Sequence, residues 1–319
     1  MGNKILVTGA TGFVGSELCA QLAVAGNSIV GVGRSAMKAG LSGVTYSRLD
    51  LEADDLDEEL IQNVDCVVHL AGQAHGKGGG DRQELDGFRR TNVDVSLRLA
   101  RQAVAAGVRR FVFVSSIGVH GTVTHGAAVS ETSPFKPDSP YTVSKMEAEL
   151  ELTKLFDEAG SSELTIVRPP LVYGATAPGN FKSLLKLANS SVPLPFGLCF
   201  NRRSLISLAA LVDFLMVCTH HPGAGNQSFV VADSSVVSTR EIVTSLRCGM
   251  NRAARLVPVP PAVMAGALGF LGKREMYNQL FRNLEIDNQK AKTLVDWMPC
   301  ENTARELAII GKLYAISCI

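Results

Sequence analysis

The sequence predicts an α/β protein built on a doubly wound parallel sheet, and three observations lead to this prediction. Short apolar runs alternate with amphipathic stretches through the first half of the chain, as they do in parallel sheets with right-handed helical crossovers. The first apolar run, 4–7, ends in a turn with glycine at positions 9, 12 and 15. The composition, with 46% hydrophobic and 19% charged residues over 319 positions, is that of a globular chain.

The expected elements follow from these patterns in chain order. Apolar runs bounded by turn residues predict strands at 4–7, 29–32, 44–49, 66–70, 111–115 and 164–167. Amphipathic periodicity predicts helices at 15–25, 54–62, 88–106 and 141–159. The glycine-rich stretch 75–80 is expected to be a loop. Ligands of such sheets bind beyond the carboxyl ends of the strands, so the loops after the strands are the candidate site.

The glycine turn after the first strand is suited to a dinucleotide. Gly9 can adopt the positive φ of a tight turn, Gly12 lets a pyrophosphate approach the backbone, and Gly15 lets the helix lie against the strand. The free N–H groups and dipole of that helix favour the phosphates. The alternative is a tight turn without a ligand. The contacts expected from this loop are Gly9, Thr11, Gly12, Phe13, Val14 and Gly15.

The loop after the second strand bears on the choice of nicotinamide cofactor. NAD sites usually carry an acid there for the ribose hydroxyls, whereas this chain has Arg34 and Ser35. A guanidinium suits a 2′-phosphate, so the sequence favours NADP(H), with NAD(H) possible and a solvated surface arginine as the alternative for Arg34. Asp50 is expected to accept from the adenine amino group. The other contacts expected at the strand ends are Leu51, Leu70, Ala71 and Gly72.

Tyr141 and Lys145 are four residues apart at the start of a predicted helix, and therefore share one face of it. A phenol of pKa ~10 is a poor base at neutral pH. An ammonium, a helix N-terminus and an oxidised nicotinamide each favour the phenolate. Tyr141 is thus expected to exchange a proton with a substrate oxygen that Ser116, at the end of the fifth strand, also bonds. The alternative is a half-buried tyrosine beside a solvated lysine.

Composition also predicts what the chain does not do. A net charge of +1 disfavours nucleic-acid binding. Seven scattered cysteines without CxxC spacing, and six histidines, predict reduced thiols and no metal site. With a strand expected almost at the first residue, we expect no signal peptide and a cytoplasmic protein. The most apolar run, 262–272, has about half of the ~20 residues that cross a bilayer; it predicts a packed or partly exposed helix and leaves peripheral membrane contact open.

Three motifs together resemble the extended short-chain dehydrogenase/reductases, and most closely their nucleotide-sugar epimerase/dehydratase branch. They are TGATGFVG at 8–15, FVSS at 113–116 and YTVSK at 141–145, and further matches at 92–93, 168–174 and 296–299 extend the likeness over nearly the whole chain. The resemblance implies a Rossmann cofactor lobe and a smaller C-terminal lobe for a nucleoside-diphosphate sugar. It implies Ser116, Tyr141 and Lys145 as catalytic residues, with Lys145 also on the nicotinamide ribose. It further implies cofactor contacts at Asn92 and Pro169.

The same resemblance predicts the substrate site and the division of the chain. Its implied substrate contacts are Ser116, Ile117, Asn180, Phe181 and Arg203; a diphosphate suits an arginine fork, and the alternative for Arg203 is a solvated surface position. Residues 1–169 and 204–232 are expected to form the Rossmann lobe, the second range as a strand, a helix and a final strand. Residues 170–203 and 233–319 are expected to form the substrate lobe. A homodimer through the helices 88–106 and 141–159 is possible.

Several departures decide between activities within the branch. The acid after the second strand is missing, Ala74 replaces a lysine of many UDP-galactose 4-epimerases, and 204–210 lacks the usual His-Val-x-Asp run. The stretches 178–181, 193–197 and 201–205 resemble enzymes of UDP-N-acetylquinovosamine or fucosamine synthesis. The sequence therefore favours NADP(H)-dependent reduction of a UDP-4-keto-6-deoxy-N-acetylhexosamine at C4. The alternatives are a UDP-glucose or UDP-N-acetylglucosamine 4-epimerase with tightly bound NAD, and, more distantly, a non-catalytic NADP(H) sensor.

Overall fold

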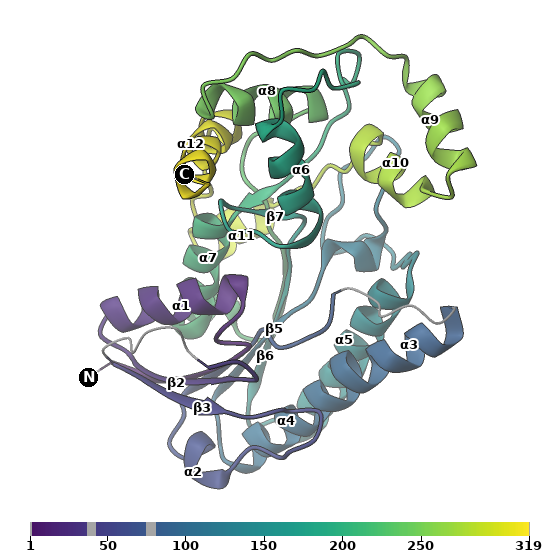
Figure 1. Ribbon diagram of the computed structural model, residues 1–319. Helices are drawn as coiled ribbons and strands as arrows, with labels where there is room; N and C mark the ends of the chain where they lie inside the picture. The colour runs from purple at the N-terminus through teal and green to yellow at the C-terminus, as the bar shows by residue number, and fades with distance from the viewer. Residues whose placement is uncertain (1, 37–42, 75–80, 319) are drawn as a thin grey trace.

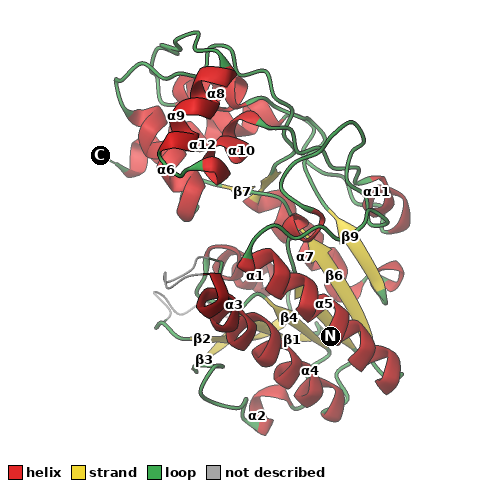
Figure 2. Cartoon of the chain, turned by 90° about the vertical axis from the view of Figure 1, so that its right-hand side faces the viewer, coloured by secondary structure: helices red, strands yellow, loops and turns green. Residues whose placement is uncertain are grey.

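The computed structural model describes residues 2–36, 43–74 and 81–318, so the stretch 75–80 lies outside the described residues. Seven parallel strands form one sheet in the order β3-β2-β1-β4-β5-β6-β9, drawn in yellow in Figure 2. The predicted doubly wound α/β fold is confirmed. The strands are β1 (Lys4–Thr8), β2 (Ser28–Gly33), β3 (Val44–Arg48), β4 (Cys66–His69), β5 (Arg110–Val114), β6 (Glu163–Arg168) and β9 (Gln227–Val230).

The central strands form where the sequence is continuously apolar, because both of their faces are covered by helices. On β1, Ile5 lies opposite Ile29 of β2 and Cys66 of β4, and all three side chains are buried. The strand order reverses between β1 and β4. A reversal of this kind opens a crevice beyond the carboxyl ends of the two strands, which is where ligands of such sheets bind.

Helices cover both faces of the sheet (Figure 1). On one face, α1 and α7 bury leucine, cysteine and phenylalanine side chains against the strands. On the other face, α4 and α5 bury a second cluster that includes Phe111 and Phe113 of β5. The helices of this part of the chain are α1 (Phe13–Val24), α2 (Glu58–Ile61), α3 (Asp81–Arg89), α4 (Val95–Ala105), α5 (Pro140–Ala159) and α7 (Leu208–His220).

Two predicted helices differ in extent from those observed. The helix expected at 54–62 is only α2, because the chain first makes a turn in which the Asp54 N–H donates to the Asp50 carbonyl at 2.9 Å. The helix expected at 88–106 is split into α3, a π-helical turn η1 (Arg90–Asp94) and α4. A π-helical turn inside a helix is often found at a functional site.

The second lobe is mainly helical (Figure 2). In it α8 and α12 cross closely at two glycines. A Cβ on Gly249 or Gly311 would overlap a backbone carbonyl of the other helix, so glycine is what allows this approach. A two-stranded sheet, β7 with β8, joins the lobes. These elements are α6 (Gly179–Asn189), α8 (Thr239–Gly249), α9 (Pro261–Phe270), α10 (Arg274–Phe281), α12 (Thr303–Ser317), β7 (Val172–Tyr173) and β8 (Ile206–Ser207), with short 3-10 turns η2 (Ile117–His120) and η3 (Pro222–Ala224) elsewhere in the chain.

The chain crosses between the lobes more often than the predicted division allows. Within 204–232, α7 and β9 lie with the main sheet, and β8 pairs with β7. Within 233–319, α11 (Gln289–Leu294) and Trp297 pack in the core beside α7. The Trp297 indole Nε1 donates to Asp213 of α7 at 3.0 Å. This stretch is therefore a departure from the predicted substrate lobe. None of the described helices is long and apolar enough to cross a membrane.

Candidate active site

The turn between β1 and α1 has the geometry expected of a phosphate-binding loop. Gly9 has φ +68°, and its carbonyl accepts from the Gly12 N–H at 2.8 Å. A Cβ on Gly15 would overlap the Gly9 carbonyl oxygen, so only glycine lets α1 begin this close to β1. A Cβ on Gly9 would lie 2.9 Å from the Ala71 nitrogen. The α1 N-terminus has no side-chain cap, which leaves its N–H groups for an anion.

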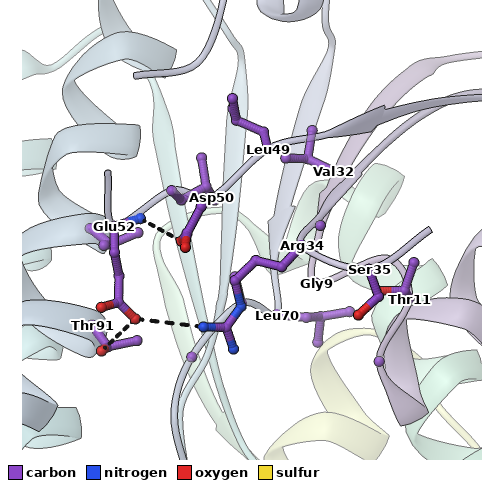
Figure 3. A pocket seen from close by; sticks show the side chains of 16 residues that line it. Gly9, Thr11, Val32, Arg34, Ser35, Leu49, Asp50, Glu52, Leu70 and Thr91 are labelled. Atoms are coloured by element: carbon purple, nitrogen blue, oxygen red, sulfur yellow. Dashed lines mark hydrogen bonds and ion pairs between the residues drawn. The ribbon is translucent and has the colours of Figure 1, made fainter. Parts of the chain in front are cut away.

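A cavity of about 300 Å³ opens over this turn (Figure 3). Most of the predicted cofactor contacts line it: Gly9, Thr11, Gly12, Arg34, Ser35, Asp50, Leu51, Leu70, Ala71 and Gly72. The other predicted contacts do not: Phe13, Val14, Gly15, Asn92, Tyr141, Lys145 and Pro169. Sequence reasoning missed six lining residues, which are Val32, Gly33, Leu49, Glu52, Thr91 and Val95.

Glu52 brings an acid to the end of the cavity where the sequence expected none. Its Oε1 lies 3.9 Å from Arg34 Nη1 and accepts from the Thr91 hydroxyl at 3.0 Å, as Figure 3 shows. The acid comes from the loop after β3, and because β2 and β3 pair in parallel, the two loops meet at one edge. Arg34, which the sequence favoured as a contact for a 2′-phosphate, therefore has a carboxylate beside it, and the preference for NADP(H) stays a prediction. Scanning the loop after the neighbouring strand for acids would have found Glu52.

Asn92, in the π-helical turn η1, holds the loop after β4 against α5. Its Nδ2 donates to the Gln73 carbonyl and to Ser144 Oγ, both at 3.0 Å, and its Oδ1 accepts from the Gln73 N–H at 2.9 Å. A Cβ on Gly72 would lie 3.0 Å from Asn92 Oδ1 and 3.5 Å from Lys145 Nζ. The amide of Asn92 is thus hydrogen-bonded to the protein itself, and it positions the loop that follows β4.

Ser116 and Tyr141 lie close to one another, and the Ser116 hydroxyl is near enough to the phenol to influence its pKa. Ser116 Oγ also accepts from the Gly118 N–H at 3.1 Å. Tyr141 is held by the start of α5, where Ser139 forms a capping box with Thr142. Burial raises the pKa of Tyr141, and the hydrogen bond from Ser116 opposes that rise. The expected lowering of this pKa also involves the charge of an oxidised nicotinamide, so it stays a prediction.

Lys145 is the buried cation of the site, with 6% of the residue exposed. Its Nζ donates to the Val114 carbonyl at 3.0 Å and lies 4.6 Å from the centre of the Phe113 ring. Burial lowers the pKa of Lys145 from its ordinary value of 10.5 to about 8, although Glu149 acts to raise it.

This pKa predicts a dependence of stability on pH. Between pH 8 and 10.5 the unfolded chain keeps a proton on Lys145 that the folded chain has lost, so the stability contributed at this site rises with pH. We expect the unfolding free energy of the wild type, relative to Lys145→Met, to increase across this window by up to about 1.4 kcal/mol per pH unit. Urea unfolding of both proteins at intervals of pH, without added nucleotide, measures it. A constant difference would contradict the assignment.

A second cavity, of about 570 Å³, lies between the lobes. All five predicted substrate contacts line it, together with Tyr141: Ser116, Ile117, Asn180, Phe181 and Arg203. Arg203 is 7% exposed, burial lowers its pKa to about 10, and its Nη1 donates to the Arg282 carbonyl at 3.1 Å. Sequence reasoning missed the α10 side of this cavity, contributed by Glu275, Gln279 and Leu280.

The described residues contain no cluster of His, Cys, Asp and Glu that could hold a metal ion. The fold and the site instead define an enzyme of the extended short-chain dehydrogenase/reductase type. Residues 5–195 match the model of the NAD dependent epimerase/dehydratase family, and the chain belongs to that family.

Its relatives include several 4-epimerases. The chain is 35% identical over 304 residues to a UDP-glucose 4-epimerase of Vibrio cholerae, covering 94% of this chain and 92% of the relative. It is 25% identical over 283 residues to the N-acetyl-α-D-glucosaminyl-diphospho-undecaprenol 4-epimerase of Escherichia coli O157:H7, covering 85% and 78%. The fold matches that of a UDP-N-acetylglucosamine 4-epimerase from Methanobrevibacter ruminantium M1 with a TM-score of 0.80, 20% identity and full coverage of both chains.

Proposed function

We propose that this chain is a UDP-sugar 4-epimerase that works with a tightly held NAD. The observation that carries the proposal is that Ser116 and Tyr141 line one cavity together with Arg203. The 35% identical relative from Vibrio cholerae is a UDP-glucose 4-epimerase, which supports epimerisation over reduction. The specific reductase activity favoured from the sequence has no support of this kind.

The residues around the first cavity fit a dinucleotide. The Gly9–Gly12 turn and the α1 N-terminus would hold the diphosphate, where a Cβ would fill the space. Asp50 and Glu52 would face the adenosine half, and Lys145, beside Gly72, the nicotinamide ribose. NAD bound here would supply the acceptor, and then the donor, of a hydride at the sugar carbon.

Within this proposal Tyr141 moves the proton. Its phenolate takes the proton from the sugar C4 hydroxyl and returns it when the alcohol re-forms, so no proton is gained or lost over the cycle. Ser116 bonds the same oxygen and keeps it in line with the phenol. Because burial raises the pKa of Tyr141 in the ligand-free protein, its activation depends on positive charge brought near the phenol on binding.

The second cavity would hold the UDP moiety and the sugar. Within the described part of the chain, the guanidinium of Arg203 makes two hydrogen bonds, and both use Nη1, at 3.1 and 3.4 Å. Its Nε and Nη2 therefore remain for a diphosphate, and a nearly buried guanidinium binds such a group strongly. Asn180 is anchored to α10 by a bond from its Nδ2 to Gln279 Oε1 at 2.7 Å, which places a polar pair at the cavity wall.

Glu52 gives the proposed preference for NAD a direct test. A carboxylate 3.9 Å from Arg34 neutralises the cation and repels a 2′-phosphate. We expect Glu52→Gln to narrow the ratio of NAD to NADP affinity by about tenfold, which is about 1.4 kcal/mol. Equilibrium binding of both nucleotides to the stripped protein measures this ratio. Asp54→Asn, an exposed acid outside the cavity, is the control and should leave the ratio unchanged; an equal shift in both variants would count against the role of Glu52.

Reduction of a UDP-4-keto sugar is the second candidate, favoured by Arg34. This side chain is 68% exposed at the cavity, and a swing away from Glu52 would free it for a 2′-phosphate. The two functions separate in one assay with purified protein, UDP-N-acetylglucosamine or UDP-glucose and no added nicotinamide, followed by NMR. The galacto epimer is the result expected here. No epimer, together with NADPH consumption on a UDP-4-keto-6-deoxy sugar, would favour the reductase.

A homodimer through the stretch 88–106, which is mainly η1 and α4, and through α5 also remains a proposal. Leu150 on α5 is 51% exposed, which supports a partner on that face. Sedimentation of the wild type and of Leu150→Glu distinguishes a dimer from a monomer.

A further inference from the structure

The helix α9 lies at the outer edge of the second lobe (Figure 1), and it exposes apolar side chains. Phe270 is 93% exposed, and Val263 and Leu271 are 58% and 62% exposed. The helix is attached through Leu268 and Met264, which join a small core with α10. Exposed apolar residues that stand singly are ordinary on protein surfaces, but a contiguous set on one helix marks an interaction site.

The charged residues before α9 and directly after it are cations, and the first acid that follows them is the exposed Glu275 on α10. The stretch 256–272 contains no charged residue, and no acid occurs between Glu241 and Glu275. Exposed cations stand on both sides of it, Arg252 and Arg255 before the helix and Lys273 after it. An apolar segment with cations at its flanks is complementary to a surface that offers hydrocarbon below a layer of negative charge.

We propose that α9 and its flanks rest on the surface of an anionic phospholipid bilayer. Phe270, Leu271 and Val263 would enter the boundary between head groups and acyl chains, and Arg252, Arg255 and Lys273 would meet the lipid phosphates. The helix has 10 residues, which is too short to cross a bilayer. Two copies of this chain paired through α9 would bring these cations together with no acid from the segment to oppose them, so the bilayer is the better occupant.

The position of α9 would place the bilayer near the second cavity. The helix α10, on which α9 packs, contributes Gln279 and Leu280 to the cavity wall. Binding through α9 would therefore bring the second cavity close to the membrane surface. The exposure and charge of α9 and its flanks do not depend on which reaction the enzyme catalyses.

Vesicle flotation of the full-length protein tests the proposal. Vesicles of phosphatidylcholine with a quarter of phosphatidylglycerol should carry the protein upward, whereas pure phosphatidylcholine should carry at least about tenfold less. Raising the salt from about 0.1 M to about 1 M should weaken the binding, because it screens the lipid charge. Wild-type protein that stays with the soluble fraction, or that binds both vesicles equally, would overturn the proposal.

Two variants and a matched control identify the surface. The double change Phe270→Glu and Leu271→Glu alters side chains that are 93% and 62% exposed, so the fold should persist while flotation falls at least about tenfold. Lys273→Glu should also reduce flotation, by at least about fivefold, because it removes one cation from the surface that faces the lipid. The control, Ile309→Glu with Leu313→Glu on α12 (42% and 49% exposed), should float as the wild type does. Equal loss in the control, or a change of oligomeric state in the α9 variant by size-exclusion chromatography, would overturn the assignment.

Discussion

Replacing Tyr141 with phenylalanine should lower kcat by about 10²- to 10⁴-fold, the range that a positioned acid–base group contributes. The ring stays in place, because its contact with Phe88, edge to face at 5.9 Å, does not involve the hydroxyl. KM for the UDP-sugar should change much less than kcat. Steady-state kinetics with the epimerase assay, together with a thermal unfolding curve, separates loss of chemistry from loss of fold.

The control for this change is Tyr314→Phe on α12. Tyr314 lies outside both cavities, so its variant should keep the wild-type rate. Normal turnover by the Tyr141 variant would remove this residue from the chemistry.

Replacing Arg168 with leucine should lower the unfolding free energy by about 3–5 kcal/mol, because it leaves a buried carboxylate without its partner. The side chains of Arg168 and Glu149 are 6% and 2% exposed, and Arg168 Nη2 donates to Glu149 Oε2 at 2.6 Å. The guanidinium also donates through Nε to both carboxylate oxygens at 3.0 Å. Denaturant unfolding of the wild type and the variant gives the difference.

The helix α5 supplies a matched control for this prediction. Arg89 bonds Glu147 in the same bidentate way, at 2.6 and 2.8 Å, but the side chains are 44% and 27% exposed. Arg89→Leu should therefore lower the unfolding free energy much less than Arg168→Leu does. The double variant Arg168→Leu, Glu149→Leu should recover much of the loss, because an apolar pair removes the uncompensated charge. Equal losses from the two arginine variants would contradict the account.

Much of the fold and part of the site could be predicted because their signals are local. The central strands are largely apolar runs, and the turn at Gly9 needs a conformation that glycine supplies. Tyr141 and Lys145 share a helix face by their spacing alone, and Ser139-Pro140 marks where that helix begins. These features depend on neighbours within a few residues, which a sequence displays directly.

The remaining features depend on contacts between distant segments. Glu52 meets Arg34 only because two parallel strands end side by side. The prediction of NADP(H) from Arg34 therefore did not take the carboxylate of Glu52 into account. Trp297 joins the core beside α7 across 84 positions of the sequence. The pKa of Tyr141 depends on how deeply α5 is buried, which spacing along a helix does not reveal.

The central claim is that one enzyme-bound nicotinamide takes a hydride from C4 of a UDP-sugar and returns it to the same carbon. The direct measurement uses UDP-glucose or UDP-N-acetylglucosamine deuterated at C4, purified protein and no added nucleotide, with NMR of the products. The account predicts the galacto epimer with deuterium retained at C4. An epimer with hydrogen at C4, or no epimer from either substrate, would contradict it.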